Sequence, residues 1–149
     1  MKRLKTLLLA ASPLAIGYAM NHAMLSFNWG GLMYSLVSIL FAVYWYWAGY
    51  ASYVDGKTAL QSILLGHSVG LLSLLLVLLQ AATAGKYPPL SVGVMAQLFF
   101  LPGLRVGFWV ESILLAFAHT RYLWITFIIT FISMVAIFGA GCLRRGRRR

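Results

Sequence analysis

Two ionisable side chains, Arg105 and Glu111, lie within a long apolar stretch, and His119 and Arg121 follow soon after it. Charged groups are costly inside a membrane and mark candidate sites, because a buried carboxylate can carry a proton or bind a cation. We predict that these groups gather with amide and imidazole side chains around a polar cavity for a substrate or an ion. The predicted polar cluster consists of Asn21, His22, Gln80, Arg105, Glu111, His119 and Arg121.

The same cluster has a structural interpretation. Glu111 could pair with Arg121, His119 or Arg105 and so hold its segment in place. Arg105 and Glu111 are six residues apart and would not face each other on one helix. Arg105 and Trp109 are four apart, which permits a cation–π contact if the segment is helical. The sequence leaves both interpretations open.

No pattern of residues names a reaction. The single cysteine, Cys142, excludes an internal disulfide, a CxxC redox motif and a cysteine-based metal site. His67 would stand on the order of 15 to 20 Å along the helices from His22 and His119, which is too far to share a haem. His22 and His119 are both predicted near the outer side of the membrane, so they remain geometrically possible as a pair of haem ligands. We predict no catalytic residue, no cofactor and no metal ion.

His67 is the polar residue predicted deepest in an apolar segment, with Ser68 beside it. Its expected role is structural, as a neutral histidine bonded to a serine or a carbonyl group of the next helix. A role in proton transfer would need an acidic partner at the same depth. Asp55, in a nearby predicted turn, is the available carboxylate.

The composition places these side chains in a membrane. Of the 149 residues, 62% are hydrophobic and only 9% are charged. A water-soluble domain of this size needs a charged surface, whereas here the charges lie mostly at the ends and in short interruptions. We therefore expect one integral membrane domain over residues 1–149.

Four apolar segments have the roughly 20 residues that a helix needs to cross the bilayer. They cover about residues 6–25, 30–54, 62–84 and 122–142. The first could instead be a cleaved signal peptide, because it has a basic start and small residues at 17–19. Its apolar character continues to Leu25, however, which favours a full membrane span.

A fifth stretch, residues 90–118, contains Pro102 and Gly103 and is predicted not to cross. Nine of the twelve Lys and Arg residues would lie inside with four crossings, in agreement with the preference of positive charge for the cytoplasm. The predicted fold is an all-α, four-transmembrane-helix antiparallel bundle. Between its third and fourth helices, a re-entrant or interfacial element turns at 101–103. The expected location is a bacterial plasma membrane, with both termini in the cytoplasm.

Small residues predict which faces of the helices pack, because lipid tails are as apolar as leucine and close backbone approach is what stabilises helix pairs. At 100° per residue, each span has one stripe of such residues. The same faces could also receive helices of a second subunit. The predicted packing seam comprises Gly31, Ser35 and Ser38 in the second span and Gly66, Gly70 and Ser73 in the third.

The run YWYWAGYASY, residues 44–53, contains six aromatic rings. Trp45 and Tyr46 fall on or beside the small-residue stripe, whereas Tyr44 and Trp47 project to the opposite side. The outward rings are typical of an aromatic belt at the headgroup level. A stacked quinone or flavin is the alternative, although no residue specific to such a ligand accompanies the rings.

Three classes of function remain. The first is a non-catalytic accessory, assembly or regulatory subunit of a membrane complex. The second is a homo-oligomeric small transporter or channel with the polar cluster at its outer face, and the third is a membrane enzyme acting on lipid. Expected partners are the bilayer, with anionic headgroups at the basic tail 144–149, and other membrane subunits or a second copy of the chain. Nucleic acid is not expected, because the tail lacks interleaved aromatic residues.

Overall fold

The computed structural model describes residues 2–27, 30–53, 58–83, 90–114 and 123–146. Every regular element in these ranges is a helix, which confirms the all-α prediction. The last helix continues four residues beyond the predicted end at 142. The helices are α1 (Lys2–Ser26), α2 (Gly31–Ser52), α3 (Ala59–Gly66), α4 (Ser68–Ala82), α5 (Leu90–Phe100), α6 (Leu104–Leu114) and α7 (Leu123–Gly146).

Three helices are long and apolar enough to cross a membrane alone, namely α1 from Leu7 onward, α2 and α7. Two further candidates are pairs of shorter helices that pass the same test together. The α3–α4 pair is bent by 50° and the α5–α6 pair by 72°. The described residues therefore contain three to five candidate spans.

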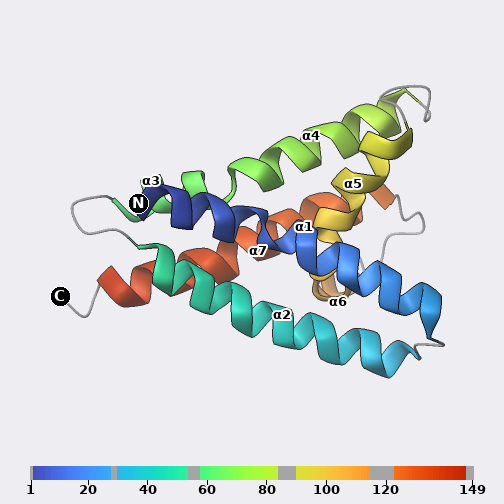
Figure 1. The fold of residues 1–149 in the computed structure, drawn as a ribbon, viewed down its shortest axis with the longest axis horizontal. Coiled ribbons are helices and arrows are strands. Elements are labelled where there is room, and N and C mark those ends of the chain that lie inside the picture. Colours follow the sequence, from blue (N-terminus) through green and yellow to red (C-terminus); the bar gives the residue numbers. More distant parts are fainter. Residues whose placement is uncertain (1, 28–29, 54–57, 84–89, 115–122, 147–149) are drawn as a thin grey trace.

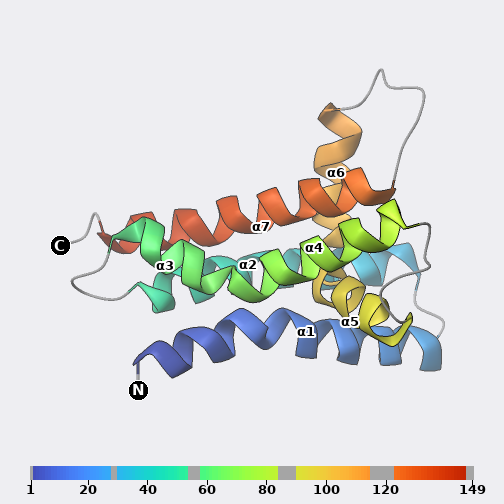
Figure 2. The ribbon, with the colours of Figure 1, turned by 90° about the horizontal axis from the view of Figure 1, so that it is seen from above.

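The helices α1, α2, α7 and the α3–α4 pair run side by side along the long axis (Figures 1 and 2). The start of α1 and the end of α7 lie at the same end of the bundle (Figure 1). At the opposite end, α5 begins near the end of α4 and runs between α1 and α4 toward the middle. There the chain turns, and α6 crosses α7 and projects beyond it (Figure 2).

Glycines allow α2 and α7 to approach with their backbones in contact. A Cβ atom added at Gly49 would overlap the Phe138 carbonyl group, and one added at Gly141 would overlap the Tyr46 carbonyl oxygen. Across this contact, the Cys142 thiol donates to the Gly49 carbonyl at 3.1 Å. The α2–α7 pair thus gains the close packing that stabilises helix association in lipid.

The third predicted span, residues 62–84, corresponds to the bent pair α3–α4. The structure starts it earlier, at Ala59, where the side chain of the N-cap residue Thr58 accepts a hydrogen bond from the Gln61 amide at 3.3 Å. It then breaks the segment at His67, which has φ −109° and ψ 8°. These angles lie outside the helical region, so α3 ends and α4 begins in a new direction.

Side-chain contacts with backbone carbonyl groups accompany this bend. The Ile63 carbonyl accepts the His67 amide at 3.0 Å, and the His67 ring Nδ1 lies at the same distance from that oxygen. One residue further on, the Ser68 hydroxyl donates to the Leu65 carbonyl at 3.0 Å. Side chains that enter the hydrogen-bond ladder of a helix are a recognised cause of sharp kinks.

The aromatic run of α2 divides largely, but not entirely, as predicted. Trp45 is fully buried and Trp47 is 56% exposed. Tyr44 departs from its predicted outward position, because its hydroxyl donates to the Ser12 hydroxyl of α1 at 2.7 Å. The Ser12 hydroxyl donates in turn to the Leu9 carbonyl at 2.7 Å, an acceptor that the missing amide of Pro13 leaves open. Tyr44 thus helps to hold a proline-containing helix against α2.

We predict that Gly49→Ala lowers the stability of the folded protein in detergent. The added methyl group meets the Phe138 backbone, which cannot rotate away, and overpacking of this kind costs roughly 1–3 kcal/mol. Gly31→Ala is the matched control, since a Cβ at this exposed first residue of α2 has nothing within 4 Å. Thermal unfolding compares the two variants, and an equal melting temperature for both would contradict the proposed backbone contact.

Candidate functional site

The break between α5 and α6 lies in the interior of the bundle at residues 101–103. Pro102 and Gly103 are buried there. Pro102 has no amide hydrogen to continue the helix, and the Gly103 amide closes a tight turn by donating to the Phe100 carbonyl at 2.9 Å. The Tyr34 hydroxyl of α2 donates to the Leu101 carbonyl at 3.2 Å. The break therefore occurs where the sequence predicts a turn, and a neighbouring helix satisfies part of its backbone.

The helix α5 is held between α1 and α4. A Cβ atom at Gly17 of α1 would overlap the Leu98 carbonyl group, so the two backbones touch. On the other side, the Gln97 amide donates to the Gln80 side-chain oxygen of α4 at 3.0 Å. A Cβ atom at Gly93 would lie 2.6 Å from the same oxygen. Gln80 of the predicted cluster is thus paired with a second glutamine in α5.

Where α6 crosses α7, the residues in contact recur at every fourth position along both helices. Glu111 and Thr126 meet at one end of this contact, where the Thr126 hydroxyl donates to Glu111 Oε2 at 2.6 Å. In the middle, a Cβ atom at Gly107 would overlap the Thr130 hydroxyl oxygen. The opposing sets are Gly103 in the turn before α6 with Gly107 and Glu111 in α6, and Thr126, Thr130 and Met134 in α7. The predicted packing seam included Gly66 and Gly70, a GxxxG motif. It missed a second such motif formed by Gly103 and Gly107, which could have indicated the contact.

Glu111 is the most buried ionisable residue among the described members of the predicted cluster, at 1% exposure. Its bond to Thr126 has the short length expected when a hydroxyl donates to a carboxylate. The second oxygen, Oε1, is buried and has no hydrogen-bond partner among the residues that the structure describes. A carboxylate in this position holds α6 to α7 through one oxygen and leaves the other able to accept a proton, a water molecule or a cation.

Arg105 lies on another side of α6 and contacts α2. Its Nε donates to the Ser35 hydroxyl at 3.2 Å, and its guanidinium carbon lies 5.7 Å from the centre of the Trp109 ring. The four-residue spacing of Arg105 and Trp109 therefore does produce the cation–π contact. Because Glu111 faces α7, the structure does not bring Arg105 and Glu111 together.

The remaining members of the predicted cluster lie elsewhere. Asn21 is half-buried beside an open groove of about 850 Å³ between α1 and α5, whose lining is mostly apolar. His22 is exposed near the end of α1. His119 and Arg121 lie outside the described residues. The described members of the cluster therefore make separate contacts and do not surround one cavity. Three of them, Gln80, Arg105 and Glu111, attach α5 or α6 to a different helix.

His67 lies in an aromatic environment and is only 4% exposed. Three rings meet the imidazole edge to face, with centroid distances of 5.7 Å for Trp45, 5.9 Å for Phe131 and 4.9 Å for Phe138. Its Nδ1 lies 3.0 Å from the Ile63 carbonyl oxygen. The ring thus bonds to a carbonyl group one turn earlier in the chain, and Asp55 lies outside the described residues.

The residues of the predicted packing seam lie mostly inside the bundle. A Cβ atom at Gly66 would overlap the Phe138 ring, and one at Gly70 would lie 3.0 Å from the Phe99 ring. Ser38 and Ser73 are buried, Ser35 is half-buried against Arg105, and Gly31 is exposed. The GxxxG of the third span thus receives aromatic rings of α5 and α7 within the same chain.

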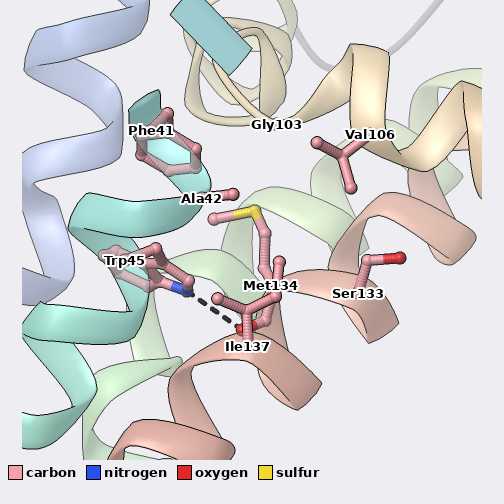
Figure 3. Close-up of a pocket in the computed structure, with 8 residues that line it drawn as sticks. All are labelled: Phe41, Ala42, Trp45, Gly103, Val106, Ser133, Met134 and Ile137. Atoms are coloured by element: carbon pink, nitrogen blue, oxygen red, sulfur yellow. Dashed lines mark hydrogen bonds between the residues drawn. The ribbon is translucent and has the colours of Figure 1, made fainter. Parts of the chain in front are cut away.

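A small cavity lies where α2, α6 and α7 meet, beside the turn at Gly103 (Figure 3). Its volume is about 10 Å³, close to the minimum that holds one water molecule. Trp45 closes one side by donating its indole hydrogen to the Met134 carbonyl at 3.0 Å. This volume is far below the several hundred Å³ of a typical small-molecule site.

Comparison of the chain with models of known protein families, with curated proteins and with solved structures finds no match.

We predict that Thr126→Val lowers stability by about 1–3 kcal/mol, because it leaves both oxygens of buried Glu111 without a donor while keeping the shape of the side chain. Ser133→Ala is the control, since the Ser133 hydroxyl donates to Ile129 of its own helix at 2.8 Å. A double-mutant cycle with Glu111→Met, followed by thermal unfolding, isolates the pair. Equal losses for Thr126→Val and Ser133→Ala would show that the bond contributes nothing.

Proposed function

We propose that this small helical membrane protein is a non-catalytic accessory or assembly subunit of a membrane complex. The observation that carries the proposal is that three polar residues of α5 and α6 bind other helices of the same chain. Gln97 bonds to Gln80, Arg105 to Ser35, and Glu111 to Thr126. Polar groups used in this way stabilise an unusual arrangement of helices and leave little for substrate chemistry.

We further propose that α5 and α6 form a re-entrant element and that α1, α2, α3–α4 and α7 cross the bilayer. The support is that α5 begins at the end of the bundle opposite to the start of α1 and reaches only its middle (Figures 1 and 2). Positive charge at both termini favours their location in the cytoplasm. The large apolar side chains exposed on these helices would then face lipid or partner helices.

We predict that the protein, extracted from its own membrane in a mild detergent, is recovered together with different and larger membrane subunits. An accessory subunit has to bind its partners strongly enough to survive extraction, and native mass spectrometry measures the composition of the recovered particle directly. Recovery only as a single chain, or as a homo-oligomer, would argue against the accessory role.

A second candidate function is transport of a proton or a small cation, and the unpartnered oxygen of Glu111 is the observation that favours it. Oε1 is buried within the α6–α7 contact, where a bound cation or proton would neutralise the carboxylate. This function would need several copies of the chain, because one small bundle encloses little space.

If Glu111 carries transported ions, Glu111→Gln will abolish proton or sodium flux into liposomes containing the purified protein. The amide can still accept the Thr126 hydrogen bond, so the variant keeps the fold while it loses the charge. Ser133→Ala provides a matched control within α7. Flux that is unchanged in Glu111→Gln, or absent from the unmodified protein, rules out the transport function and leaves the accessory role standing.

A further inference from the structure

At the end of the bundle formed by the last turns of α2 and α7, two arginines are held by tyrosines. Arg144 donates from one terminal nitrogen to the Tyr46 hydroxyl at 3.1 Å. Arg145 donates from the corresponding nitrogen to the Tyr50 carbonyl oxygen at 3.0 Å, and its guanidinium carbon lies 5.4 Å from the centre of the Tyr50 ring. Both side chains are thereby restrained beside each other on the surface.

These arginines carry positive charge that the described residues do not neutralise. The only carboxylate in the described ranges is Glu111, which bonds to Thr126 near the other end of α7. At 1.5 Å per residue, Thr126 and Arg145 are separated by about 28 Å along the helix. Each guanidinium has five N–H donors, whereas the bonds described above use one terminal nitrogen of each. Against the described residues, the pair therefore keeps both charge and donors for an anionic ligand.

An apolar surface continues from the arginines toward the middle of the bundle. On α2, Val43 lies about one turn before Tyr46 and Trp47, and Trp47 lies about one turn before Tyr50, so exposed apolar side chains adjoin the two tyrosines. Val43 is 64% exposed and Trp47 is 56% exposed. A ligand that fits this surface has a negative headgroup and a long apolar tail, which is the chemistry of an anionic phospholipid.

We propose that Arg144 and Arg145, positioned by Tyr46 and Tyr50, bind the phosphate of an anionic phospholipid whose acyl chain lies along Val43 and Trp47. The proposal rests on the location of the helices in a bilayer and is independent of the accessory role. It differs from general attraction of a basic tail to a membrane, which needs only charge. An arginine pair binds phosphate through several directed N–H donors, a geometry that lysine does not reproduce.

The test compares variants that all keep the same net charge. Delipidated protein in detergent is titrated with phosphatidylglycerol or phosphatidylcholine, and native mass spectrometry counts the lipids that remain bound. We expect the unmodified protein to retain phosphatidylglycerol at least about tenfold more tightly than Arg144→Lys/Arg145→Lys. Arg147→Lys/Arg148→Lys, in the adjoining tail, is the matched control and should keep the affinity of the unmodified protein.

Two further variants cover the case in which the double variant fails to fold. Tyr46→Phe removes the hydroxyl that positions Arg144 without changing any charge, and Arg145→Lys alone removes the guanidinium above Tyr50. Each should weaken phosphatidylglycerol retention several-fold at an unchanged melting temperature. Equal retention of the two lipids by the unmodified protein would overturn the proposal. So would equal weakening in the control tail variant, or full retention by the variants Tyr46→Phe and Arg145→Lys.

Discussion

A chain that breaks a helix within a bilayer has to satisfy the freed backbone groups with protein atoms, because hydrocarbon offers no hydrogen bonds. The turn between α5 and α6 meets this constraint in the interior of the bundle. Its own short-range bonds close the turn, and Tyr34 supplies a donor to the Leu101 carbonyl. The break at His67 meets it locally, through the His67 ring and the Ser68 hydroxyl. The positions of the surrounding helices follow from the need to cover these two breaks.

The helices can pack closely around the two breaks because glycines lie opposite aromatic rings and backbone carbonyl groups. Gly66 and Gly70 accept the rings of Phe138 and Phe99, and Gly107 accepts the Thr130 side chain. Where glycine meets a carbonyl group, as Gly49 meets Phe138, two helix backbones touch. In lipid, such close contacts are a main source of helix association, since burial of apolar surface gains little there. The rings that fill the core are therefore fixed by glycines distant in sequence.

Two groups of polar contacts lie at opposite ends of the bundle. Near the start of α7, Gln80, Arg105 and Glu111 each attach the broken element to a different long helix. At the other end, Arg144 and Arg145 are held by α2 and keep their charge available at the surface. This distribution connects the two proposals, because the first set supports the proposed accessory role and the second supports the proposed contact with lipid.

The sequence by itself determined the properties that depend on local composition. Long apolar runs require helices in lipid, Pro102 and Gly103 require a turn, and the Arg105–Trp109 spacing places a cation over a ring on any helix. Only the tertiary structure decided which residues meet across helices. The break at His67 lies within an apolar run that the sequence predicts as one span, and the Glu111–Thr126 and Gln80–Gln97 pairs join different helices. Their spacing along the chain carries no signal, because the docking of α5 and α6 into the bundle selects the partners.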